Sequence, residues 1–193
     1  MKKNENLKSL SLNEIEYYKV HGRNISGQCP LPLFFNGSGI EVNVTGSELW
    51  IDLEVDCDFH EPWIYTALNN SFMSRQMLLP GSYSICLFRS MTFGVPKTMK
   101  FFRELQAMSE DDDCHVFVRG FRCDGEFHIL VKGFQTDGFF LPTSEKRYKI
   151  EFIGDSITSG EGTYGAKEDT DWLAMYMSSS RNYAVMTANA LNA

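Results

Sequence analysis

The sequence lacks the features that mark membrane and exported proteins. No hydrophobic run approaches the ~18 residues that a helix needs to cross a bilayer. The polar start, residues 1–6, is not followed by the apolar core of a signal peptide. We therefore expect a cytoplasmic protein with no membrane partner.

Cysteine and basic residues are also too few or too scattered for several functions. The five cysteines are an odd number with no C-x-x-C spacing, which predicts reduced thiols and no disulfide framework. Asp and Glu number 25 against 18 Lys and Arg, and the net charge of −7 argues against a nucleic-acid partner. The cysteine and histidine spacings match no zinc module, and the acidic tract at 110–113 lacks the ligand spacing of a calcium loop. We expect no metal site.

The composition is that of a folded protein. Hydrophobic residues make up 43% of the 193 residues and aromatics 13%, enough for a substantial core. The clearest element is the stretch 49–56, where Leu49, Ile51, Leu53 and Val55 alternate with polar residues and Trp50. A period of two over eight residues predicts a strand with one buried face.

Short strand-like runs separated by turn residues continue on both sides of that stretch. They are Pro62–Leu68, Gln76–Leu79, Ser82–Phe88, Lys100–Leu105, His115–Phe121 and Glu126–Val131. Asn36-Gly37, between two apolar stretches, predicts a hairpin, and Asn69-Asn70 predicts a further turn. This pattern favours a mainly β fold, a jelly-roll-type antiparallel sandwich over residues 14–140, after a flexible segment 1–13.

The sequence pattern changes after a predicted linker at 141–147. The apolar run Tyr148–Ile153 predicts a buried strand, and a loop with four glycines follows it. The segment 181–191 has helical spacing, with Ser178–Ser180 as candidate caps. Strand, glycine loop and helix form the opening unit of a parallel α/β sheet, which we assign to residues 148–193.

Within this last unit stands Gly154-Asp155-Ser156, followed by Gly160 and Gly162. The block resembles the one that opens the SGNH (GDSL-type) hydrolases, and the longer match from Phe152 is similar to carbohydrate esterase family 2. That family consists of acetyl esterases with a β-sandwich before the hydrolase domain, which is the order predicted here.

The resemblance implies a cofactor-free, metal-independent serine esterase acting on acetylated carbohydrate. Ser156 would attack the ester carbonyl, and its backbone N–H would stabilise the oxyanion. Gly154, Asp155, Gly160 and Gly162 would support the nucleophile loop. The family's catalytic histidine and its other oxyanion donors come from later blocks, so we expect this fragment alone to be inactive. None of the histidines at 21, 60, 115 and 128 is expected to be the base.

Two tryptophans are candidates for substrate contact. Trp172 would line the cleft beyond the nucleophile, and Trp50, on the polar face of its strand, would stack on a sugar. Alternatives remain open at this point. Serine also commonly caps helices or turns, and the chain could be a non-catalytic carbohydrate-binding or structural sandwich. A third alternative is an SGNH esterase or lipase for another acyl ester.

Overall fold

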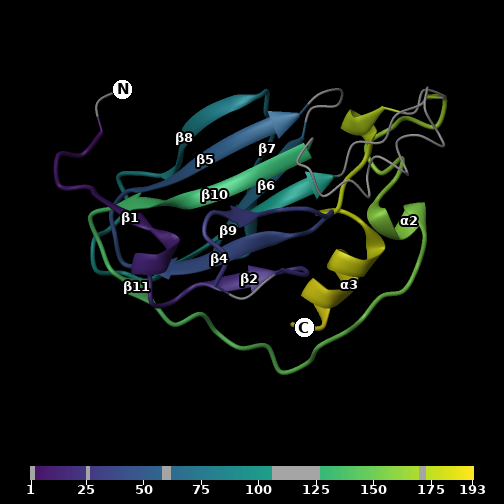
Figure 1. The fold of residues 1–193 in the computed structure, drawn as a ribbon. Helices are drawn as coiled ribbons and strands as arrows, with labels where there is room; N and C mark the ends of the chain where they lie inside the picture. The colour runs from purple at the N-terminus through teal and green to yellow at the C-terminus, as the bar shows by residue number, and fades with distance from the viewer. Residues whose placement is uncertain (1–2, 25–26, 58–61, 106–126, 170–172) are drawn as a thin grey trace.

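Two antiparallel sheets packed face to face form most of the computed structural model, which describes residues 3–24, 27–57, 62–105, 127–169 and 173–193 (Figure 1). The strands are β1 (Lys8–Ser11), β2 (Lys19–His21), β3 (Leu31–Pro32), β4 (Gly39–Val44), β5 (Leu49–Cys57), β6 (Trp63–Leu68), β7 (Ser71–Met77), β8 (Gly81–Phe88), β9 (Lys97–Leu105), β10 (Phe127–Thr136) and β11 (Phe140–Leu141). The helices are η1 (Leu12–Glu14), α2 (Ser156–Ser159), η2 (Ala174–Tyr176) and α3 (Tyr183–Ala190). The predicted mainly β fold is confirmed.

Within the described ranges, one sheet has five strands in the order β1-β10-β5-β8, with β3 also paired to β10. The other has six in the order β11-β4-β9-β6-β7, with β2 also paired to β4. The core lies between them. Leu49, Ile51, Leu53 and Val55 of β5 are all at most 3% exposed, as their alternation predicted. Buried side chains of β4 and β9 face them, so each sheet buries one face against the other.

Several expected bounds were wrong. Part of the supposedly flexible segment 1–13 is β1, which pairs with β10 from Lys8 to Ser11. The strand expected at Gln76–Leu79 is β7, which starts at Ser71 because the turn before it is tight. Asn69 and Asn70 both have positive φ, 50° and 66°, the geometry of a two-residue hairpin turn. The expected strand His115–Phe121 lies outside the described residues.

The Asn36-Gly37 turn is real, but it does not form a hairpin. Gly37 adopts a φ of 70°, and the turn leads from β3 in the five-stranded sheet to β4 in the six-stranded sheet. The dipeptide predicts that the chain reverses. It does not predict whether the strands on either side pair with each other or with other strands.

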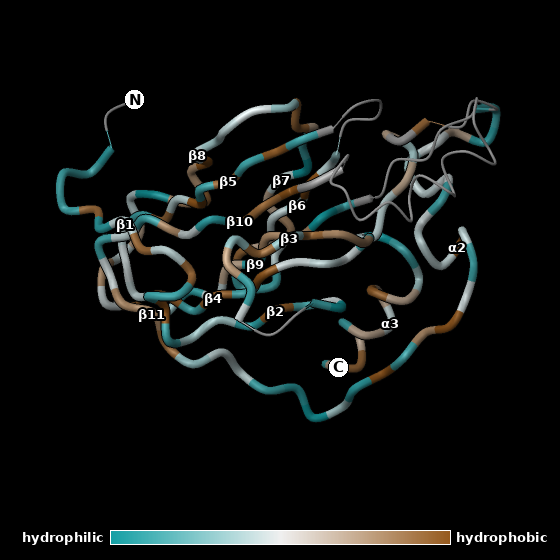
Figure 2. The backbone as a smooth tube through the Cα atoms, viewed as in Figure 1, coloured by the Kyte–Doolittle hydropathy of each residue, from teal (hydrophilic) through white to brown (hydrophobic). Residues whose placement is uncertain are grey.

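The predicted strand Tyr148–Ile153 was also wrong. These residues form no strand, and Ile153 is 90% exposed. A strand exists only through hydrogen bonds to a neighbour, and in the described part of the chain no strand pairs with this segment. After β11 the chain instead runs along the outside of the sandwich to α2, with hydrophobic and hydrophilic residues both represented (Figure 2). Part of the predicted linker is strand, since β11 ends at Leu141.

The helix predicted at 181–191 is confirmed as α3. Its cap is Asn182, whose side chain accepts a hydrogen bond of 2.8 Å from the backbone N–H of Val185, so the expected capping role of Ser178–Ser180 was wrong. Among the described residues there is no helix of the length and apolarity that a bilayer span requires.

Candidate active site

Ser156 lies at the start of the short helix α2, on the exposed surface. Asp155 precedes it as the N-cap, and its Oδ1 accepts a hydrogen bond of 3.1 Å from the N–H of Ile157. The aspartate therefore orders the turn, the role the sequence suggested for it. As the first helical residue, Ser156 has a backbone N–H with no acceptor inside the helix. Its hydroxyl and its N–H are thus both at the surface end of a locally ordered turn.

Two of the predicted glycines have conformations that favour glycine. Gly160 ends α2 with a φ of 95°, and a Cβ there would lie 1.9 Å from the carbonyl oxygen of Ser178. Gly162 has a φ of 68° with open space around it. Gly154 differs, because a Cβ would meet only the side chain of Thr158. The backbone at Gly160 must therefore approach another segment closely.

The turn is fixed by contacts from two other segments. Asn182 donates from Nδ2 to the carbonyl oxygen of Thr158 across 2.6 Å, and the Thr158 hydroxyl lies 2.8 Å from that of Tyr183. Asn36 donates to the carbonyl oxygen of Ser159 across 3.2 Å. The loop before β4 and the start of α3 therefore both hold the nucleophile turn.

Sequence reasoning missed a buried carboxylate next to this region. Glu104, on β9, is fully buried and binds the hydroxyls of Ser178, Ser179 and Ser180. Lys100, Arg103 and Glu104 are all charged, so the stretch 100–105 carries no sequence signal that this carboxylate is buried. Its burial depends on the partners that the fold brings to it.

A histidine in contact with Ser156 is not found among the described side chains. His21 instead places its Nε2 3.1 Å from Oε2 of Glu41 and packs against Phe102 with ring centroids 4.9 Å apart. His60 and His115, and the side chain of His128, lie outside what the structure describes. The arrangement supplies a candidate nucleophile and an oxyanion donor, and the described residues contribute no base.

The two candidate tryptophans have different outcomes. Trp172 lies outside the described residues, so its role stays a prediction. Trp50 is half-buried on β5, its indole N–H donates to Glu48 across 2.5 Å, and the ammonium of Lys3 lies 4.3 Å from the ring centroid. One face of the ring is therefore already covered from within the chain, and sugar stacking at Trp50 stays a prediction.

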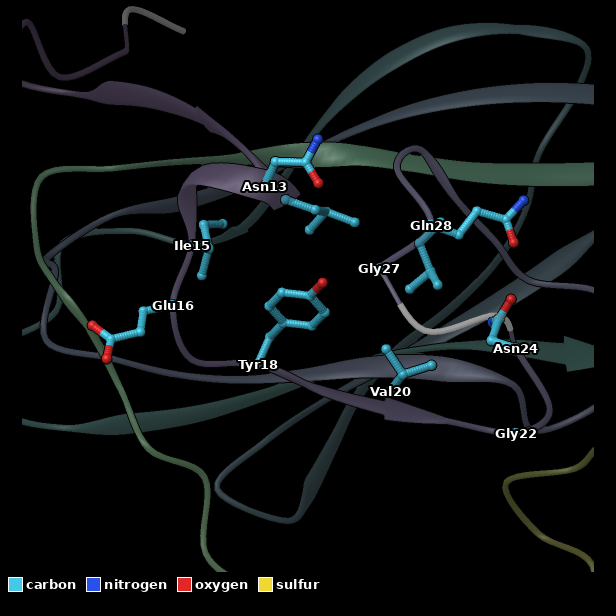
Figure 3. A pocket seen from close by; sticks show the side chains of 11 residues that line it. Asn13, Ile15, Glu16, Tyr18, Val20, Gly22, Asn24, Gly27 and Gln28 are labelled. Carbon is cyan, nitrogen blue, oxygen red and sulfur yellow. The ribbon is translucent and has the colours of Figure 1, made fainter.

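A pocket of about 610 Å³ opens elsewhere, between η1, β2 and the loop before β3. Figure 3 shows the Tyr18 ring in the middle of its labelled side chains, with Asn24 and Gln28 on one side. No described lining residue comes from the segment that carries Ser156. This pocket is separate from the candidate nucleophile.

Comparison with known proteins finds similar chains among solved structures. No protein-family model and no curated protein matches the chain. Among solved structures, an acetyl xylan esterase from the rumen bacterium Butyrivibrio proteoclasticus is 50% identical with a TM-score of 0.84, covering 97% of this chain and 47% of that one. Family two carbohydrate esterases from Clostridium thermocellum and Cellvibrio japonicus are 21% and 18% identical, with TM-scores of 0.69 and 0.72. They cover 91% and 96% of this chain, and 48% and 50% of theirs.

The similarity to the Clostridium and Cellvibrio esterases shows a shared fold. The Butyrivibrio esterase is in addition identical to this chain at half of the aligned positions. In each case the chain spans about half the length of the protein it matches. Over nearly all of its own length, the chain is thus a relative of the family 2 carbohydrate esterases, as the resemblance of its Gly154-Asp155-Ser156 block indicated.

Proposed function

We propose that this chain supplies the nucleophile of a serine esterase that removes O-acetyl groups from carbohydrates. The observation that carries the proposal is the exposed Ser156 at the ordered start of α2, in a chain 50% identical to an acetyl xylan esterase over 97% of its residues. The similar solved structures are carbohydrate esterases, which supports the general class of carboxylic ester hydrolase. The acetyl group, the carbohydrate and the serine mechanism are the proposed detail.

In this mechanism the Ser156 hydroxyl attacks the ester carbonyl and forms an acetyl-enzyme, and the sugar hydroxyl leaves. Water then attacks the acyl carbonyl and releases acetate. The Ser156 hydroxyl is too weakly acidic to react alone, so a base must take its proton. The backbone N–H of Ser156 would donate to the oxyanion, a contribution of about 3 to 4 kcal/mol per donor in serine hydrolases.

The base and further oxyanion donors would come from residues other than those described. Activity is therefore to be measured on the protein expressed from its complete gene. The substrates are acetylated xylan oligosaccharides, their deacetylated counterparts and a long-chain acyl ester, with released acid quantified.

We expect acetate from the acetylated oligosaccharides and little acid from the long-chain ester. Oligosaccharide binding without any acetate release would favour the alternative of a non-catalytic binding or structural sandwich. Preference for the long-chain ester would favour a different acyl substrate. We further propose a cytoplasmic location, which fractionation of the source cells would test.

A further inference from the structure

We propose that Glu104 and Arg75 of the sandwich are positioning residues for the nucleophile turn, acting through the segment 175–182. The expected effect of these residues on catalysis rests on the function proposed above. Their expected effect on the order of the turn does not. It assigns a second task to the β domain, which is to hold the turn that carries Ser156.

Glu104 binds the serine segment through both of its carboxylate oxygens. Its Oε1 accepts from the hydroxyls of Ser178 and Ser180 across 2.6 and 2.8 Å. Its Oε2 accepts from the N–H of Ser180 and the hydroxyl of Ser179 across 3.0 and 3.2 Å. The carboxylate is 0% exposed, so its charge is satisfied by these donors and by Arg75. Three consecutive serines therefore bind one carboxylate from the sandwich.

Arg75, on the edge strand β7, completes this anchor. Its Nε lies 3.3 Å from Oε1 of Glu104, and its guanidinium donates to the carbonyl oxygens of Met175 and Met177 across 3.0 and 2.8 Å. The guanidinium also lies 4.1 Å from the ring centroid of Trp63 and 4.6 Å from that of Tyr164. Arg75 thus pairs with the buried carboxylate and binds the same segment directly.

The anchored segment in turn holds the nucleophile turn. Ser178, bound to Glu104 through its hydroxyl, donates from its backbone N–H to the carbonyl oxygen of Gly160 across 2.9 Å. Gly160 donates back into α2, to the carbonyl oxygens of Ile157 and Ser156. Four residues after Ser178, Asn182 binds the carbonyl oxygen of Thr158. The chain of contacts therefore runs from Glu104 to the residue that carries the nucleophile.

Most of the side-chain bonds of Glu104 leave the sandwich. Every side-chain bond of Glu104 described here goes to the serine segment or to Arg75. A buried carboxylate held this way has one arrangement in which its donors are satisfied, so it fixes the segment in one place. The pair with Arg75 joins β9 to β7 within one sheet, whereas the four bonds to the serines join the sandwich to the segment 178–180.

The test compares Glu104→Gln with Glu48→Gln. Glu48 is also a buried glutamate of the sandwich, paired with Arg89 across 3.4 Å, but it lies near Gly46 and Lys97 at the far end of β9 from Glu104. Glutamine keeps the shape of the side chain and puts an NH₂ group where donors converge. Amide hydrogen exchange is measured over residues 156–160, together with the melting temperature of each variant.

We expect exchange at Ile157, Ser159 and Gly160 to rise about tenfold in Glu104→Gln and to stay at the wild-type rate in Glu48→Gln. In the protein from the complete gene, kcat for acetate release should fall about tenfold in Glu104→Gln with KM unchanged. Unchanged exchange in a folded Glu104→Gln, or an equal rise in both variants, would overturn the positioning role.

The exchange result stands apart from the function. If exchange rises in Glu104→Gln and the wild-type protein releases no acetate, the positioning role holds and the esterase proposal fails. Should Glu104→Gln not fold, Ser180→Ala removes one bond to the carboxylate and leaves the others. It should raise exchange in the turn by a smaller factor, and wild-type exchange there would equally overturn the proposal.

Discussion

The backbone N–H of Ser178 donates to the carbonyl oxygen of Gly160, and the Ser178 carbonyl oxygen occupies the space where a Cβ of residue 160 would be. Two segments of the C-terminal region are therefore in direct backbone contact immediately after α2. The contact is close because residue 160 has no side chain and a φ of 95°.

We expect Gly160→Ala to lower the free energy of unfolding more than Gly162→Ala. Both residues have left-handed backbone conformations, which cost a residue with a Cβ about 1 to 2 kcal/mol. Only at Gly160 does a Cβ also collide with backbone, at 1.9 Å from Ser178 O. Urea denaturation of both variants measures the difference. Equal losses would mean that the close approach has no energetic consequence.

The Asn69-Asn70 turn allows a second matched comparison. Glycine relieves the positive φ at either position, but only Asn69 uses its side chain to accept a hydrogen bond, of 3.0 Å, from the backbone N–H of Thr98. The Asn70 side chain accepts a surface hydrogen bond of 3.0 Å from the ammonium of Lys100. We expect Asn70→Gly to be as stable as the wild type or more so, and Asn69→Gly to lose about 1 kcal/mol. Chemical denaturation gives both values, and the reverse order would refute this assignment of the turn's stability.

The stability contributed by Glu41 should depend on pH. Burial raises the pKa of Glu41, but the hydrogen bond from His21 and the charges of Lys100, His21 and Lys19 outweigh it, so the pKa lies below its ordinary value. A lowered folded pKa contributes stability above the unfolded value and loses it as the pH falls through the folded value.

Glu41→Gln should therefore cost about 1.5 kcal/mol at pH 7, and the difference from wild type should shrink below the ordinary glutamate pKa of 4.5. The control is Glu54→Gln, because Glu54 pairs with Lys132 at the exposed surface, where a pair contributes about 0 to 1 kcal/mol. Denaturation at several pH values checks both. A constant loss for Glu41→Gln across that range would contradict the charge argument.

Elements with a strong local signal were predictable from the sequence. The alternation in β5 describes a buried face that the residues themselves define. The helical spacing at 181–191 located α3, although Tyr183, Met186 and Leu191 are exposed and only Ala184 of the helix is buried. The Gly-Asp-Ser block likewise located the turn of Ser156, since glycine and an N-capping aspartate act within a few residues.

Features that depend on distant partners were not predictable in this way. The segment Tyr148–Ile153 has the composition of a strand but no neighbour among the described strands, and Asn36-Gly37 turns between sheets. The contacts of Glu104 with the serines at 178–180 span more than 70 residues of sequence. Periodicity carries no information about such pairings, because they arise only when separate elements pack.

The role of Ser156 as the nucleophile is tested by measuring acetate release by the protein from the complete gene. Ser156→Ala is compared with Ser159→Ala, which removes an exposed hydroxyl at the other end of the same helix. We expect a loss of at least about 1,000-fold in kcat for Ser156→Ala and near wild-type release for Ser159→Ala. Retention of most of the activity by a folded Ser156→Ala would contradict it.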